Sequence, residues 1–83
     1  MTVAQMMEDI AFAALDVLVV TPAGRVSFFF NIDHVSEDKD IFYMEDINGR
    51  PFELNKNSEV KLKEDGTYSI NQGDCLFCIK LSA

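Results

Sequence analysis

The residues best able to do chemistry in this 83-residue chain are Cys75, Cys78 and the single histidine, His34. Two cysteines separated by two residues can bind a metal or cycle between thiol and disulfide. A structural zinc site needs about four ligands, and the sequence has no third cysteine. A redox Cys-x-x-Cys motif normally follows a strand and opens a helix. This pair lies instead in the alternating stretch CLFCIKL, which is typical of a strand, so we expect no metal or cofactor.

Strand geometry also argues against a disulfide between Cys75 and Cys78. Residues three apart in a strand lie about 10 Å apart and point to opposite faces, whereas a disulfide needs Cα atoms within about 7 Å. We therefore predict that both cysteines are packing residues. Cys75 shares a face with Phe77, Ile79 and Leu81, so we expect Cys75 to be deeply buried and Cys78 less so.

Known catalytic motifs are absent from the sequence: it has no glycine-rich phosphate loop, nucleophile elbow or His-Glu-x-x-His pattern. Asp33 and His34, with Glu37 or Asp38, could form a general acid–base group, but such residues also crowd ordinary surface loops. The stretch SEDKD lacks the glycine and ligand spacing of an EF-hand calcium loop. With one histidine and a chain too short to form a deep cleft easily, the sequence predicts a protein that is not an enzyme.

Charge is the strongest functional signal, because the chain carries a formal net charge of −7 and its acids concentrate within residues 1–46. Most of them fall in one segment, interleaved with apolar and aromatic residues. The predicted partner-binding residues are the acids of that segment and its tyrosine: Asp33, Glu37, Asp38, Asp40, Tyr43, Glu45 and Asp46.

This acidic segment disfavours direct binding to nucleic acid, since phosphate contacts require clustered Lys or Arg. The acids could serve only to keep a small domain soluble. The functional interpretation is a docking face for a basic protein surface, including that of a nucleic-acid-binding protein. Inhibitor or immunity-type proteins, such as anti-restriction proteins, anti-CRISPR proteins and antitoxins, are analogous in this respect. The alternative is a structural subunit of a homo-oligomer or homodimer, for which the acids are solubilising charge.

The start of the chain does not predict a signal peptide, because no Lys or Arg precedes Arg25 and Glu8, Asp9 and Asp16 interrupt the apolar residues. The same charges exclude a membrane span of about 20 apolar residues. Two cysteines are too few for the disulfide framework of small secreted domains. We therefore expect a cytoplasmic protein with one domain, residues 1–83.

Local patterns predict a helix followed by strands. Thr2 and Gln5 form a capping-box pattern, and methionines at helical spacing extend the predicted helix over residues 3–15, ending at Asp16. The methionine stripe is either a core face or a partner groove. The β-rich part covers residues 17–82, and residues 33–40 have the polarity of a surface loop. The fold class is α+β: a short N-terminal helix packed on a bent antiparallel sheet or small barrel of five to six strands.

Turn residues predict how these strands pair. A loop at residues 22–24 sets Val20 opposite Val26 and Leu18 opposite Phe28, with Val26, Phe28, Phe30 and Ile32 buried and Phe29 on the other face. A two-residue Asn48-Gly49 loop pairs Tyr43 with Leu54, and Pro51 marks a late start or an edge strand. A three-residue loop at residues 64–66, with Gly66 left-handed, pairs Leu62 with Tyr68 and Val60 with Ile70.

Overall fold

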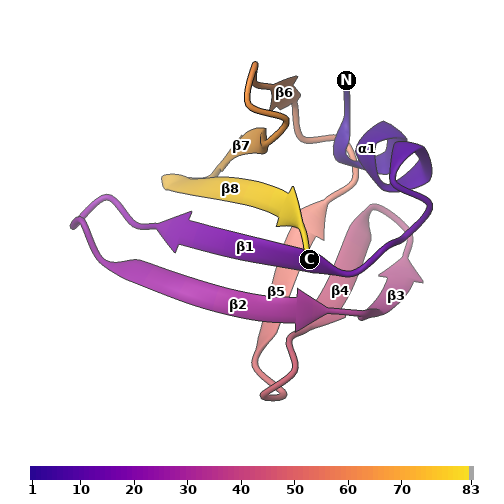
Figure 1. Cartoon of the computed structure of the whole chain (residues 1–83), viewed down its shortest axis with the longest axis horizontal. Coiled ribbons are helices and arrows are strands. Elements are labelled where there is room, and N and C mark those ends of the chain that lie inside the picture. Colours follow the sequence, from indigo (N-terminus) through magenta and orange to yellow (C-terminus); the bar gives the residue numbers. More distant parts are fainter. Residues whose placement is uncertain (83) are drawn as a thin grey trace.

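The chain folds into two antiparallel sheets and one short helix in the computed structural model, which describes residues 1–82 (Figure 1). The elements are α1 (Val3–Asp9), β1 (Leu15–Val20), β2 (Val26–Ile32), β3 (His34–Asp38), β4 (Ile41–Glu45), β5 (Pro51–Asn55), β6 (Val60–Leu62), β7 (Tyr68–Gln72) and β8 (Cys75–Leu81). One sheet has the order β2-β1-β8-β7-β6 and the other the order β3-β4-β5. The α+β class is confirmed, but the strands form two sheets and no closed barrel, and the predicted count of five to six strands was too low. Ala83, the last residue of the predicted domain, lies outside the described residues.

Helix α1 begins with the predicted capping box. The backbone N–H of Gln5 donates to Oγ1 of Thr2 at 3.3 Å, and the backbone N–H of Thr2 donates to Oε1 of Gln5 at 2.8 Å. The helix is shorter than predicted, because Ala11 and Phe12 adopt left-handed φ values of 53° and 54° that an α-helix cannot contain. Asp16, the predicted helix end, lies inside β1.

A bulge in β2 reverses the face that the β1–β2 hairpin buries. The predicted pairs Val20 with Val26 and Leu18 with Phe28 are confirmed, but Leu15 pairs with Ile32 whereas Val17 pairs with Phe29. Two steps along β1 therefore match three along β2, and the extra residue places Ile32 on the same face as Phe29. This face packs on the core. The prediction that Val26, Phe28 and Phe30 are buried was wrong: all three are exposed.

The segment predicted as a loop at residues 33–40 is mostly strand β3. It pairs with β4 from His34 opposite Glu45 to Asp38 opposite Ile41. Its polarity is that of an edge strand with one solvent-exposed face, because only Val35 on the inner face packs against the core. A tight turn with a left-handed Lys39 connects β3 to β4.

The turn between β4 and β5 is one residue longer than predicted. Asp46 and Arg50 flank it, since the N–H of Asp46 donates to the carbonyl oxygen of Arg50 at 3.1 Å. The register is therefore Tyr43 with Glu53 and Phe42 with Leu54, and the predicted pair of Tyr43 with Leu54 was wrong. As predicted, Pro51 begins an edge strand.

The C-terminal strands match the sequence-based register. Val60 pairs with Ile70 and Leu62 with Tyr68 around a three-residue loop, and Gly66 has a φ of 86°. Both cysteines lie in the predicted strand, β8. Cys75 is half-buried, as is Cys78, so the prediction of deep burial for Cys75 alone was wrong.

The inner faces of the two sheets pack together, with their strands crossing steeply in Figure 1. Phe52 of the three-stranded sheet contacts Phe29 and Phe77 of the five-stranded sheet, with ring centroids 4.9 Å and 6.3 Å apart. Helix α1 closes one end of this core by burying Met6 and Met7 completely. The methionine stripe is therefore a core face rather than a partner groove. The buried core residues are Val3, Met6, Met7, Leu15, Val17, Ile32, Phe42, Met44, Leu54, Val60, Ile70, Phe77 and Ile79.

Candidate functional site: the acidic face of the three-stranded sheet

The outer face of the β3-β4-β5 sheet carries two of the six predicted acids, Asp38 and Glu45, together with the predicted Tyr43. Residues opposite one another in an antiparallel pair share a face, and so do residues two apart along a strand. The pairs of Ser36 with Tyr43 and of Tyr43 with Glu53 therefore define one row across this face. The outer face comprises His34, Ser36, Asp38, Ile41, Tyr43, Glu45, Pro51, Glu53 and Asn55. We call it the acidic face, since its charged residues Asp38, Glu45 and Glu53 are all carboxylates.

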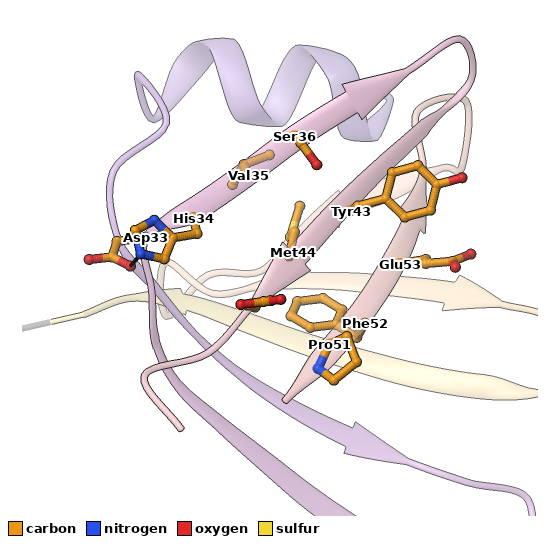
Figure 2. Close-up of a pocket in the computed structure, with 10 residues that line it drawn as sticks. Asp33, His34, Val35, Ser36, Tyr43, Met44, Pro51, Phe52 and Glu53 are labelled. Carbon is orange, nitrogen blue, oxygen red and sulfur yellow. Dashed lines mark ion pairs between the residues drawn. The ribbon is translucent and has the colours of Figure 1, made fainter. Parts of the chain in front are cut away.

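A hollow of 510 Å³ lies on the acidic face (Figure 2). Its lining includes Asp33, Glu45 and Glu53, together with His34 and Tyr43, and contains no Lys or Arg. Asp33, which lies just before β3, contributes a carboxylate whose Oδ1 is 3.8 Å from Nε2 of His34. Figure 2 shows Tyr43 and Glu53 side by side on neighbouring strands. The hollow therefore combines negative charge with a half-exposed aromatic ring.

Two predicted residues, Glu37 and Asp46, lie off the acidic face and form ion pairs within the chain. Glu37 lies opposite Phe42, on the other side of the sheet, and its Oε1 is 3.2 Å from Nζ of Lys56. The same Lys56 amine lies 5.0 Å from the centre of the Phe42 ring. Glu37 is thus neutralised by an intramolecular partner and points away from the hollow.

Asp46 is buried in the β4–β5 turn, where both of its carboxylate oxygens accept hydrogen bonds. Its side chain is 0% exposed. Oδ1 accepts hydrogen bonds from the backbone N–H of Asn48 at 3.0 Å and of Arg50 at 2.8 Å, and Oδ2 accepts from Nε of Arg50 at 3.0 Å. Burial alone would raise the pKa of Asp46, but the hydrogen bonds and charge of Arg50 and the N–H of Asn48 outweigh it and lower the pKa.

The remaining predicted residues are exposed. Asp33, Asp38, Asp40, Tyr43 and Glu45 all lie at the surface. Asp40 occupies the β3–β4 turn next to Lys39, outside the hollow, and its carbonyl oxygen accepts from the N–H of Lys56 at 2.8 Å. Of the seven predicted residues, three line the hollow (Asp33, Tyr43 and Glu45), two lie outside it (Asp38 and Asp40), and two have ion-pair partners within the chain (Glu37 and Asp46).

Glu53 is the acid of the hollow that the sequence analysis missed. The assumed two-residue turn at Asn48 paired Tyr43 with Leu54, which placed Glu53 on the opposite face. A signal for the correct register was present. Asp46 stands two residues before Asn48, where an Asp side chain commonly accepts the N–H two residues later and initiates a turn.

The acidic face presents carboxylates, a phenol and an imidazole at the surface. His34 and Ser36 share the face, but no hydrogen bond joins their side chains in the described residues, so they do not form the nucleophile–base contact of an activated serine. The pair of His34 with Asp33 is highly exposed, with side chains 81% and 58% accessible. Carboxylates and a phenol offer hydrogen-bond acceptors to Lys, Arg or backbone N–H groups of a partner.

Metal ligands, thiols and apolar helices are the other features of residues 1–82 that could form a functional site. No group of three or more His, Cys, Asp or Glu side chains in this range converges as metal ligands would. Cys75 and Cys78 are free thiols. No helix within the same range is long and apolar enough to cross a membrane.

Known proteins provide no relative with which this face could be compared. No protein-family model, no curated protein and no solved structure matches this chain.

Proposed function

We propose that this chain is a non-enzymatic protein-binding module that docks a basic surface of a partner protein on its acidic face. One observation carries the proposal: the hollow over β3, β4 and β5 is lined by Asp33, Glu45 and Glu53 with no Lys or Arg. Carboxylates gathered without compensating cations create a local negative potential, which attracts a basic surface and speeds its association. Tyr43, at 38% exposure, supplies the kind of aromatic anchor that is enriched at interfaces.

Partners that bind nucleic acid fit this chemistry well, because their binding surfaces present Lys and Arg spaced to meet phosphates. On such a partner, the carboxylates of the acidic face would take the places of phosphate groups. The module would then act as an inhibitor that competes with nucleic acid for the same basic groove. Binding of this kind is salt-sensitive, since exposed charges are screened over about 10 Å at 0.1 M salt.

The experiment uses an arginine- and lysine-rich peptide as a defined basic probe, with a glutamate-rich peptide of equal length as the control probe. Amide NMR shifts of the chain are followed during titration at low and high salt. We expect the basic peptide to shift resonances of Tyr43, Glu45 and Glu53 and of their strand neighbours, and we expect added salt to abolish the shifts. Shifts spread evenly over all acids of the chain, or concentrated outside β3, β4 and β5, would refute the proposal.

A matched pair of charge reversals tests the same face in cells or lysate. Glu45→Lys with Glu53→Lys reverses two carboxylates of the hollow, whereas Glu8→Lys with Glu64→Lys makes the same change in net charge at exposed positions outside it. We expect basic proteins recovered with the wild-type chain to be lost from the first variant and retained by the second. Equal loss from both variants would show that only net charge matters.

A further inference from the structure

The outer face of the five-stranded sheet is apolar, although no other part of the described chain covers it. The register of β1 with β2 and β8 places every second residue of these three strands on this face. The apolar residues so placed are Leu18, Val20, Val26, Phe28, Phe30, Leu76 and Cys78. We call them the apolar face; it lies on the side of the sheet opposite the core residues Val17 and Ile79.

The apolar face has a ridge beside a hollow. Phe28 and Phe30 stack with ring centroids 5.6 Å apart and an interplanar angle of 13°, and they are 50% and 49% exposed. The stacked rings border a hollow of 260 Å³, whose lining also includes Asp16, Leu18, Cys78 and Lys80. Such a surface can be self-complementary, because the ridge of one copy can fit into the hollow of a second copy.

The exposed area fits the centre of a dimer interface. A half-exposed Phe leaves about 100 Å² accessible, so Phe28, Phe30 and Val26, which is 54% exposed, leave about 250–300 Å² together. The half-buried residues of β1 and β8 add to this. Stable interfaces bury about 800 Å² per partner, with an apolar centre and a polar rim. Here the rim comprises Asp16, Lys61, Thr67, Ser69, Asn71 and Lys80, which project from the same side of the sheet.

We propose that two copies of the chain pack their apolar faces together in a two-fold symmetric dimer. Paired sheets commonly stack about 10 Å apart with interdigitated side chains. A two-fold axis that runs parallel to the strands between β1 and β8 sets β1 of one copy over β8 of the other, and β2 over β7. Leu18 then meets Cys78 of the second copy, and the Phe28–Phe30 ridge meets the small side chains of Thr67 and Ser69.

Charge complementarity favours a second copy of the chain as the partner of the apolar face. Asp16 lies directly opposite Lys80 in the β1–β8 pair, so the same axis brings Asp16 of each copy to Lys80 of the other. The hydrogen bonds that Asp16 receives from Asn31 and Ser82 both fall on Oδ1, which leaves Oδ2 for the incoming amine. The lining of the hollow is neutral, with one acid and one base, whereas the chain as a whole has a net charge of −7.

The same arrangement keeps the acidic faces apart. The three-stranded sheet packs on the inner side of the five-stranded sheet, so its outer face lies on the far side of the molecule from the apolar face. A dimer through the apolar faces therefore presents two acidic faces on opposite sides. This limits repulsion between the copies and leaves both hollows open.

The mass of the chain in solution tests the dimer, measured by sedimentation equilibrium over a concentration series. We expect a mass that rises from one chain to two and stops there. Phe28→Asp should weaken the dimer by about tenfold or more, because it buries a carboxylate at the centre of an apolar interface. Tyr43→Asp makes the matched change on the acidic face and should leave the dimer unchanged. A mass of one chain at every concentration, or a dimer that Phe28→Asp does not weaken, overturns the proposal.

Two further measurements do not depend on the folding of the Phe28 variant. Lys80→Glu should weaken the dimer through repulsion by Asp16 of the second copy, while Lys39→Glu, in the β3–β4 turn away from the apolar face, should not. In the wild-type chain, labelling of the Cys78 thiol should slow as concentration rises, whereas Cys75, on the other side of the sheet, should label at a constant rate. Labelling of Cys78 that is independent of concentration would contradict the dimer.

Discussion

The backbone N–H of Asn31 donates a hydrogen bond to Oδ1 of Asp16 at 2.9 Å, and this contact holds the bulge of β2 against β1. Asn31 adopts a left-handed φ of 51°, which Asn tolerates better than most residues. Oγ of Ser82 donates to the same Oδ1 at 2.7 Å and ties the chain after β8 to the bulge. The bulge brings Phe29 and Ile32 to the core and leaves Phe28 and Phe30 outside.

Asp16→Asn should destabilise the protein by about 1 kcal/mol at pH 7, because hydrogen bonds to a charged acceptor are stronger and Asp16 is only half-buried. The hydrogen bonds of Asn31 and Ser82 lower the pKa of Asp16. The stability that these hydrogen bonds add is therefore fully present above the pKa of Asp16 in the unfolded chain, about 3.9. It is lost as pH falls through the lower pKa of Asp16 in the folded protein. Urea unfolding should show that the difference in free energy of unfolding between wild type and Asp16→Asn is smaller near pH 3 than at pH 7. Glu64→Gln serves as the control variant. A gap of constant size would contradict the carboxylate's role.

Asp46→Ala should lower the unfolding midpoint and loosen the β4–β5 turn, because the backbone N–H groups of Asn48 and Arg50 lose their acceptor. The pKa of Asp46 is lowered on balance by these bonds. Their contribution to stability is therefore also lost as pH falls below the pKa that Asp46 has in the unfolded chain and through its lower pKa in the folded protein. Hydrogen exchange at the Asn48 and Arg50 amides checks the effect. Exchange should accelerate there and stay unchanged in the loop containing Gly66; faster exchange in both loops would indicate global destabilisation instead.

Leu54→Ala and Leu62→Ala are the same substitution at a buried and at an exposed position. Leu54 is 0% exposed and lies in the core, whereas Leu62 is 58% exposed at the end of β6. We expect Leu54→Ala to cost about 2–5 kcal/mol through lost transfer energy and the cavity left behind, and Leu62→Ala to cost about 0.5 kcal/mol or less. Denaturant titration of both variants measures the difference. Equal costs would contradict the burial of the β5 face.

Cys75→Ser and Cys78→Ser should cost similar amounts, about 1 kcal/mol each, because both thiols are half-buried. Neither change should alter metal content, and mass spectrometry of the native protein should find two free thiols. Stoichiometric zinc, or a native disulfide between the two cysteines, would restore this pair as a functional site.

Sequence alone determined the features that depend on neighbouring residues. The capping box at Thr2 and the strand that contains both cysteines follow from local hydrogen-bonding and steric preferences, and the three-residue loop before Thr67 follows from the apolar pattern of the two strands beside it. The loop was identified because only one register set apolar residues opposite one another. The same criterion, that apolar residues face one another across a strand pair, would place Phe42 opposite Leu54 and so give the observed register of β4 and β5.

Tertiary structure decided which face of each strand is buried and which acids share a surface. Period-two alternation makes Phe28 and Phe29 equally eligible for the core, and the packing of Phe29 against Phe52 of the other sheet decides in favour of Phe29. The charge pattern indicated an acidic surface, but the partners of Glu37 and Asp46 and the position of Glu53 depend on strand register and on Lys56 and Arg50. The contact of Phe29 with Phe52 forms only when the two sheets pack together, and that of Glu37 with Lys56 only when distant strands pair, so the preferences of neighbouring residues predict neither contact. The pair of Asp46 with Arg50 is the exception, because it lies within one turn.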